Sequence, residues 1–188
     1  MLALLVTKPP SSSSVKPVGS IWRSDLSGLP ISMRRAYGRV QTTSFTCQDA
    51  SIKRLKPIQM FDSGHRLVDE VQVYALMLTN GNGIQVIVYF TRENRQGLEG
   101  FQYRHRPTDK RMIGQKPTGI TSVQFIAPDQ STDEMKSHVF RDSFSTRLFL
   151  GRVREGRITG SLTTVFPDSR RSFISGAFKA RLVGIDKP

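Results

Sequence analysis

The sequence contains few of the residues that cross-link a chain or anchor it in a membrane. A single cysteine, Cys47, among 188 residues excludes an intrachain disulfide framework and a structural zinc site built on cysteines. No apolar run approaches about 20 residues, the length that a membrane-spanning helix needs. A folded chain of this length buries roughly 70% of the surface that it exposes when unfolded, so a hydrophobic core suffices to hold it together.

Motifs for catalysis and cofactor binding are missing as well. The chain has no glycine-rich phosphate loop, no dinucleotide fingerprint and no GxSxG elbow. Its three histidines (His65, His105 and His138) lie far apart and form no HxH, HxxxH or HExxH pair. We therefore expect no metal and no cofactor, and an inert, buried thiol at Cys47 rather than a nucleophile. A non-enzymatic protein is favoured, although an enzyme without such a motif stays open.

Acidic residues are scarce relative to basic ones. Fifteen Asp and Glu face 28 Lys and Arg, which gives a formal net charge of +13. Such a field favours polyanions: nucleic acid, anionic lipid surfaces or acidic polysaccharides. No block of five or six consecutive basic residues occurs, so the excess is spread along the chain and a dedicated basic tail is not indicated. A plain solvated basic surface is the competing interpretation.

The first 36 residues differ from the rest in having no sustained helical or strand period. A six-residue apolar start is followed by Thr7-Lys8-Pro9-Pro10 and by four serines at 11–14. We interpret residues 1–36 as an extended or disordered N-terminal arm and residues 37–188 as a single β-rich domain. A targeting segment, the remnant of a longer signal, and an arm that becomes ordered along a partner are the alternatives.

Most of the domain carries the two-residue period of β-strands. Residues 71–79 and 84–91 flank an Asn/Gly turn at 80–83 and predict a central hairpin. Residues 143–150, 157–166 and 174–182 alternate apolar and polar side chains and predict a three-stranded meander with one buried face. Weaker strand signals cover 37–45, 101–106 and 121–127, and short helices are conceivable at 50–60 and 129–138. The fold class predicted is all-β: an antiparallel β-sandwich or barrel of about eight or nine strands, with at most one or two short helices.

The most suggestive stretch for ligand binding is 101–106. As a strand it would place Phe101, Tyr103 and His105 on one face and Gln102, Arg104 and Arg106 on the other. Rings beside arginines resemble a surface for single-stranded nucleic acid, whereas the alternative is an aromatic core face backed by solvated arginines. Further arginines crowd the two connections of the meander, which lie at opposite ends and would form two basic tips: Arg152, Arg154 and Arg157 at one, Arg170 and Arg171 at the other. Of these, Arg152, Arg154, Arg170 and Arg171 are candidate polyanion-binding residues.

Residues 61–70 bring two acids, a histidine and an arginine together just before the central hairpin. Acid–base chemistry would need these groups to converge in a pocket. The favoured interpretation is a polar loop in which Asp62 and Ser63 close a turn through their side chains.

These observations favour a non-enzymatic β-rich binding or assembly protein that contacts nucleic acid or another polyanion. The alternative is an exported or envelope-associated sandwich or barrel that binds a small ligand or a polysaccharide. A homo- or hetero-oligomeric assembly is compatible with both. The compartment is open, with a cytoplasmic location slightly favoured over export.

Overall fold

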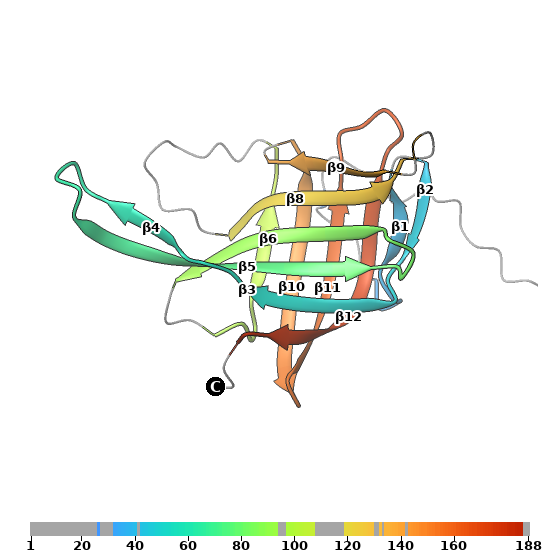
Figure 1. Ribbon diagram of the computed structural model, residues 1–188. Helices are drawn as coiled ribbons and strands as arrows, with labels where there is room; N and C mark the ends of the chain where they lie inside the picture. Colours follow the sequence, from blue (N-terminus) through green and yellow to red (C-terminus); the bar gives the residue numbers. More distant parts are fainter. Residues whose placement is uncertain are drawn as a thin grey trace, which may run out of the picture.

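The computed structural model describes residue 26 and residues 32–40, 42–93, 97–107, 119–129, 132, 134–141 and 143–185. These residues form twelve β-strands and no helix, so the all-β prediction is confirmed (Figure 1). No helix in this described part of the chain is long and apolar enough to cross a membrane. The strands are β1 (Tyr37–Val40), β2 (Thr43–Thr46), β3 (Asp49–Arg54), β4 (Ile58–Phe61), β5 (Leu67–Thr79), β6 (Gln85–Glu93), β7 (Gln102–His105), β8 (Gly119–Pro128), β9 (Met135–Phe140), β10 (Ser145–Arg154), β11 (Arg157–Val165) and β12 (Phe173–Val183).

Nine strands lie in one hydrogen-bonded path, in the order β7-β10-β11-β12-β3-β5-β6-β8-β9. The sheet curls, so that β10, β11 and β12 pass behind β3, β5, β6 and β8 and cross them (Figure 1). All neighbours on the path are antiparallel except β12 and β3, which pair in parallel through three residues each. Twelve strands replace the eight or nine expected, and neither a two-sheet sandwich nor a closed barrel is confirmed.

One hydrophobic core fills the space inside the curl. Side chains from both halves meet in it, for example Leu76 and Val88 from the front half and Leu148 and Leu162 from the back half. All four are fully buried, and burying such a side chain stabilises a fold by roughly 1.5–3 kcal/mol. The predicted alternation of the meander is confirmed, because its apolar set faces this core and its polar set faces outward.

The predicted arm includes residues that pack on the domain. Ala36 is fully buried, and the backbone at 34–36 exchanges hydrogen bonds with Ala177 of β12. Leu26 is also buried and contacts Val165 and Phe173 on the outer side of the back half. The remaining residues of the 1–36 segment lie outside the described part of the chain, apart from 32 and 33.

Several local predictions are corrected by the structure. The segment predicted as one strand at 37–45 is a hairpin of β1 and β2. The helix considered at 50–60 is β3 followed by β4, because Pro57 interrupts the segment and both parts pair with β5. The helix considered at 129–138 is wrong where it is described, since Met135–His138 pair with β8 as part of β9.

The predicted turn at 80–83 is confirmed by its hydrogen bonds, and the turn at 62–66 is confirmed for the Asp62 side chain. Asn80 Oδ1 accepts from the backbone N–H of Asn82 and Ile84, which fixes the β5–β6 hairpin. Asp62 Oδ1 accepts from the N–H of Gly64 and Arg66 in the same way. Only the first half of the segment predicted as a polar loop at 61–70 is a loop, and it joins β4 to β5. Leu67 to Glu70 extend β5 well beyond the body of the sheet (Figure 1).

Candidate functional site

The outer side of the back half is the surface that carries Arg104, Arg152 and Arg154 of the predicted basic residues. Leu148, Leu150 and Leu162 point into the core, so the side chains that alternate with them on β10 and β11 point outward. At β7 the same alternation turns His105 inward and Arg104 outward. We call the exposed part of this side that lies toward the β10–β11 turn the basic face. Its residues are Phe149, Arg152, Arg154, Arg157, Lys179 and Arg181.

Tyr103 points into the protein rather than onto the basic face. Its ring stacks on Phe101 with the ring centroids 5.2 Å apart, and it occupies the space beside the α-carbon of Gly119. Phe101 in turn packs on Phe90, and Phe90 on Tyr74, with centroid distances of 5.3 and 5.4 Å. Tyr103 is thus the outermost ring of an aromatic core row, the arrangement that the alternative interpretation of 101–106 describes.

Phe149 is the aromatic residue that the basic face presents to solvent. It is 38% exposed although it lies in the middle of β10, between Arg147 and Arg152 in sequence. Its cross-strand neighbours are small or polar: Gln102 on β7 and Ser161 on β11. Small neighbours leave the ring face uncovered, so Phe149 can stack against a planar group from outside.

Three arginines form one cross-strand row on the same side of the sheet, four residues along β11 from Ser161, the neighbour of this ring. Arg154 is directly opposite Arg157, and Arg157 is directly opposite Arg181, so all three side chains project from the same side of the sheet. Like charges placed directly opposite one another destabilise a sheet. Within the described residues Arg154 and Arg157 form no ion pair, and Arg181 pairs with Asp49. Two of the three charges in the row, those of Arg154 and Arg157, are therefore not neutralised by an ion pair within the described residues.

A β-bulge adds Arg152 to the same surface. Leu150 pairs with Gly160 and Val153 with Ile158, so two residues of β10 oppose the single residue Thr159. Leu150 and Val153 both pack toward the core, which leaves Gly151 and the exposed Arg152 on the outer side.

A cavity of about 310 Å³ lies at the margin of the basic face, where β12 and β3 diverge before they pair. Arg35, Arg157 and Lys179 line it, together with Asp49. Cys47 lies in the same cavity and is buried, as the sequence predicted, and burial raises the pKa of its thiol. The cavity thus holds three cationic side chains over a thiol that stays protonated at neutral pH.

The ion pair at this cavity makes the fold sensitive to acid. Arg181 Nη2 donates to Asp49 Oδ2 at 2.7 Å and lowers the pKa of that carboxyl below its ordinary value. The pair therefore stabilises the fold above the ordinary Asp pKa of about 3.9, and its contribution is lost as the pH falls through the lowered pKa.

We expect Asp49→Asn to remove this part of the acid dependence. Both side chains are about half exposed, so the effect should stay below about 1 kcal/mol. The measurement is the free energy of unfolding in urea from about pH 5 to about pH 2 for both proteins. Parallel curves over that range would contradict a stabilising role for the pair.

The part of the same side that lies away from the β10–β11 turn is covered by Leu26. Arg147 Nη2 donates to the backbone carbonyl of Leu26, and the Leu26 side chain packs on Val165 and Phe173. Arg104 is directly opposite Arg147 at this level and stays exposed at the edge strand. Arg106 follows it, also exposed, where β7 ends. Arg104 thus lies on the outer side, closer to the covered part than to the arginine row.

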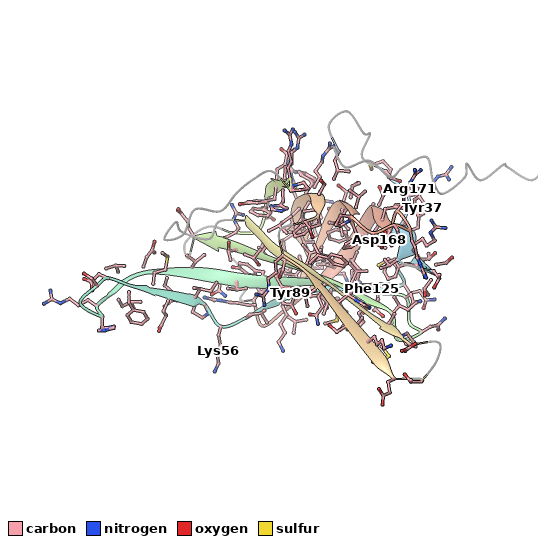
Figure 2. The ribbon with its side chains drawn as sticks, turned by 90° about the horizontal axis from the view of Figure 1, so that it is seen from above. Tyr37, Lys56, Tyr89, Phe125, Asp168 and Arg171 are labelled. Carbon is pink, nitrogen blue, oxygen red and sulfur yellow. The ribbon has the colours of Figure 1, made fainter. Side chains whose placement is uncertain are left out.

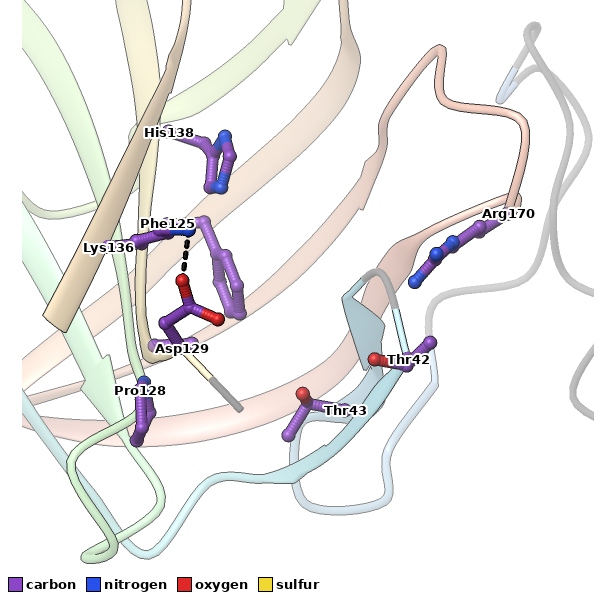
Figure 3. A pocket seen from close by; sticks show the side chains of 9 residues that line it. Thr42, Thr43, Phe125, Pro128, Asp129, Lys136, His138 and Arg170 are labelled. Atoms are coloured by element: carbon purple, nitrogen blue, oxygen red, sulfur yellow. Dashed lines mark ion pairs between the residues drawn. The ribbon is translucent and has the colours of Figure 1, made fainter. Parts of the chain in front are cut away.

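Arg170 and Arg171 lie at the other end of the meander, in the β11–β12 turn, so the structure does not bring them to the basic face (Figures 1 and 2). Arg170 lines a separate cavity of about 280 Å³ with Thr42, Phe125 and His138 (Figure 3). Lys136 in that cavity is paired with Asp129 (Figure 3). The two predicted basic tips are therefore separate, as expected from the alternation of connections in a meander.

Phe149, Lys179 and Arg181 were not predicted as members of one surface with Arg152, Arg154 and Arg157. A usable signal was present, because these residues occupy the polar positions of the meander and adjacent strands bring such positions side by side. Within the described residues no three His, Cys, Asp or Glu side chains group as metal ligands would. The chain matches no protein-family model, and no curated protein or solved structure is significantly similar to it.

Proposed function

We propose that this protein is a non-enzymatic binding protein for single-stranded nucleic acid and that the basic face is its binding surface. The observation that carries the proposal is the exposed ring of Phe149 on the same side of the sheet as the row of Arg154, Arg157 and Arg181, four residues away along β11. Proteins that bind single strands without sequence preference combine a stacking ring with cations that follow the backbone. The formal net charge of +13 favours approach of any polyanion to this surface.

The roles differ along the face. Phe149 would stack on a base, and the arginine row would contact successive phosphates, because guanidinium groups bind phosphate oxygens in pairs. Arg152 and Lys179 lie between the ring and the row, and the cavity beside Lys179 offers room for one phosphate. Tyr103 is outside this proposal, since its ring belongs to the core row.

Binding of a small ligand inside the fold has less support. The inside of the curl is filled by large buried side chains, among them Phe45, Phe90, Phe144 and Phe166. The cavities beside Lys179 and beside Arg170 are lined largely by charged and polar residues, so they suit anionic groups better than apolar ligands. A third cavity of about 290 Å³, lined by Val165, Phe166 and Pro167 at the β11–β12 turn, is mainly apolar.

Fluorescence anisotropy with a labelled, unstructured single-stranded oligonucleotide tests the proposal. Stacking contributes about 1–3 kcal/mol per base, so Phe149→Ala should weaken binding by roughly 5- to 150-fold with an unchanged salt slope. Arg154→Ala combined with Arg157→Ala should make the slope of log K against log salt shallower by about 0.7 for each phosphate that the variant no longer neutralises. Lys56→Ala is the control, because it removes a positive charge at the base of the β4–β5 hairpin, away from the face (Figure 2).

The outcomes separate nucleic acid from polyanions in general. Heparin should compete at low salt but should bind the parent and Phe149→Ala equally, because it offers no base to stack. If Phe149→Ala, with an unchanged melting temperature, binds the oligonucleotide like the parent, the stacking role is wrong. If the parent does not bind the oligonucleotide at low salt, the proposed function is wrong altogether.

A further inference from the structure

The cavity of about 310 Å³ beside Lys179 lies in a gap in the pairing of β12, and we call it the recess. On one side of the gap the backbone at 34–36 exchanges hydrogen bonds with Ala177, and on the other side β3 pairs with β12 from Arg181 onward. Lys179 lies between these two contacts, so backbone bounds the recess at both ends along β12. Buried side chains line its inner part: Cys47, Ala50 and Phe178.

Three cationic side chains from separate parts of the chain line the recess. Arg35 precedes β1, Arg157 begins β11 and Lys179 lies in β12. Within the described residues none of the three forms an ion pair. Positive charges held together in this way repel one another, and a bound anion would relieve that repulsion.

The other groups that line the recess do not supply the missing negative charge. The carboxylate of Asp49 accepts a hydrogen bond from Arg181 at 2.7 Å, and Arg157 contributes only a weaker charge interaction to it. The thiol of Cys47 stays uncharged at neutral pH, because burial raises its pKa. The cavity beside Arg170 differs in this respect, since its Lys136 and Asp129 neutralise each other (Figure 3).

A phosphate at the end of a strand fits the recess better than a phosphate within one. A phosphate monoester carries about 1.5 to 2 negative charges at neutral pH and three strong acceptor oxygens, which match three cationic side chains. A phosphodiester carries one negative charge and two free oxygens, and the strand must leave it on both sides. The pairing at Ala177 and at Arg181 bounds the recess in both directions along β12, so only one path out is needed for a terminal phosphate.

The recess is close to the stacking ring of the basic face. Phe149 is directly opposite Ser161, and Ser161 is directly opposite Ala177, which lines the recess. Two strand spacings therefore separate the ring from the recess, about 10 Å in all. A short run of nucleotides spans this distance, so a strand whose terminal phosphate occupies the recess can stack a nearby base on Phe149.

We propose that the recess holds the terminal phosphate of a nucleic-acid strand, so that the protein binds phosphorylated strand ends in preference to hydroxyl ends. This inference rests on the proposed binding of single strands at the basic face and adds a selectivity for ends to it. Arg157 and Lys179 serve both the strand and its end, whereas Arg35 lies outside the basic face and serves the terminal phosphate.

Fluorescence anisotropy with three internally labelled oligonucleotides of one sequence tests the selectivity. One carries a 5′-phosphate, one a 3′-phosphate and one a hydroxyl group at both ends. The parent should bind one of the phosphorylated strands about tenfold more tightly than the hydroxyl strand, because the terminal phosphate adds charge-assisted hydrogen bonds. Arg35→Gln should bring this ratio of affinities close to one.

Two control variants remove the same charge elsewhere and should keep the ratio of the parent. Arg34→Gln changes the exposed neighbour of Arg35, which does not line the recess. Arg66→Gln changes an exposed residue at the tip of the β4–β5 hairpin, far from the recess (Figure 1). If either control lost the preference as Arg35→Gln does, the preference would follow total charge and the proposal would be wrong.

The remaining outcomes separate this inference from the proposed function. A parent that binds all three strands equally would overturn the end selectivity and leave the binding of single strands intact. A parent that binds none of them would overturn both. An Arg35→Gln variant with an unchanged melting temperature and the full preference would place the terminal phosphate elsewhere. Isothermal titration of the parent with inorganic phosphate identifies the other source of this chemistry: binding that Arg35→Gln abolishes, without any preference among strands, would assign the recess to free phosphate instead.

Discussion

Replacing Phe90 by alanine should lower the free energy of unfolding by about 4 kcal/mol, the largest effect that we expect from any single substitution in this protein. Phe90 is fully buried on β6 and lies between the rings of Tyr74 and Phe101 in the core row. The substitution removes buried apolar surface and leaves a cavity. It also removes the ring that contacts both Tyr74 and Phe101 in the parent. Urea denaturation of the parent and the variant measures the difference.

The matched control is Phe61→Ala, which removes the same side chain from the exposed tip of the hairpin. We expect this change to alter the free energy of unfolding by no more than about 0.5 kcal/mol. A Phe90→Ala variant as stable as Phe61→Ala would mean that the aromatic row does not form.

Gly176→Ala should destabilise the protein by about 3 kcal/mol. Gly176 lies on β12 with a φ of +142°, which side chains of L-residues rarely adopt. A Cβ at this position would lie 2.6 Å from the carbonyl oxygen of Arg34 and from the α-carbon of Ala36. These are backbone atoms, so they cannot rotate away, and the 34–36 segment would have to leave the sheet.

Gly97→Ala serves as its control, because a Cβ there would meet no atom within 4 Å and the residue has no positive φ. That variant should be as stable as the parent or slightly more stable, since alanine reduces the freedom of the unfolded chain. Thermal unfolding of both variants makes the comparison. Equal melting temperatures would show that residues 34–36 do not lie against β12.

Local patterns in the sequence are sufficient to predict the strands of the meander and of the β5–β6 hairpin. A two-residue period determines which side chains are buried, and the Asn80 side chain closes its turn using neighbours within four residues. The helix considered at 50–60 fails because strand pairing overrides weak local signals: β3 and β4 both find a partner in β5, which follows them in the sequence.

The candidate site was predicted only in part, for a related reason. Arg104 lies on the outer side, as the alternation with Tyr103 and His105 predicted. Arg152 and Arg154 were predicted in a connection but belong to β10, and Arg152 points outward only because of the β-bulge after Leu150. Tyr103 and Phe149 are both aromatic residues in strands, and only the packing of β7 against β8 shows that the first ring is enclosed and the second is open. The joining of Arg157 to Arg181 depends on the register of two strands, which no short sequence motif specifies.

The parallel pairing of β12 with β3 has a consequence for synthesis of the chain on the ribosome. β3, β5, β6 and β8 emerge first and can pair with one another, but their inner side chains, such as Leu76 and Val88, need the back half to cover them. β12 joins the two halves and is translated after all the other strands. The nascent chain therefore carries an uncovered apolar sheet until β12 has left the ribosome, and this is the interval in which a chaperone would protect it from aggregation.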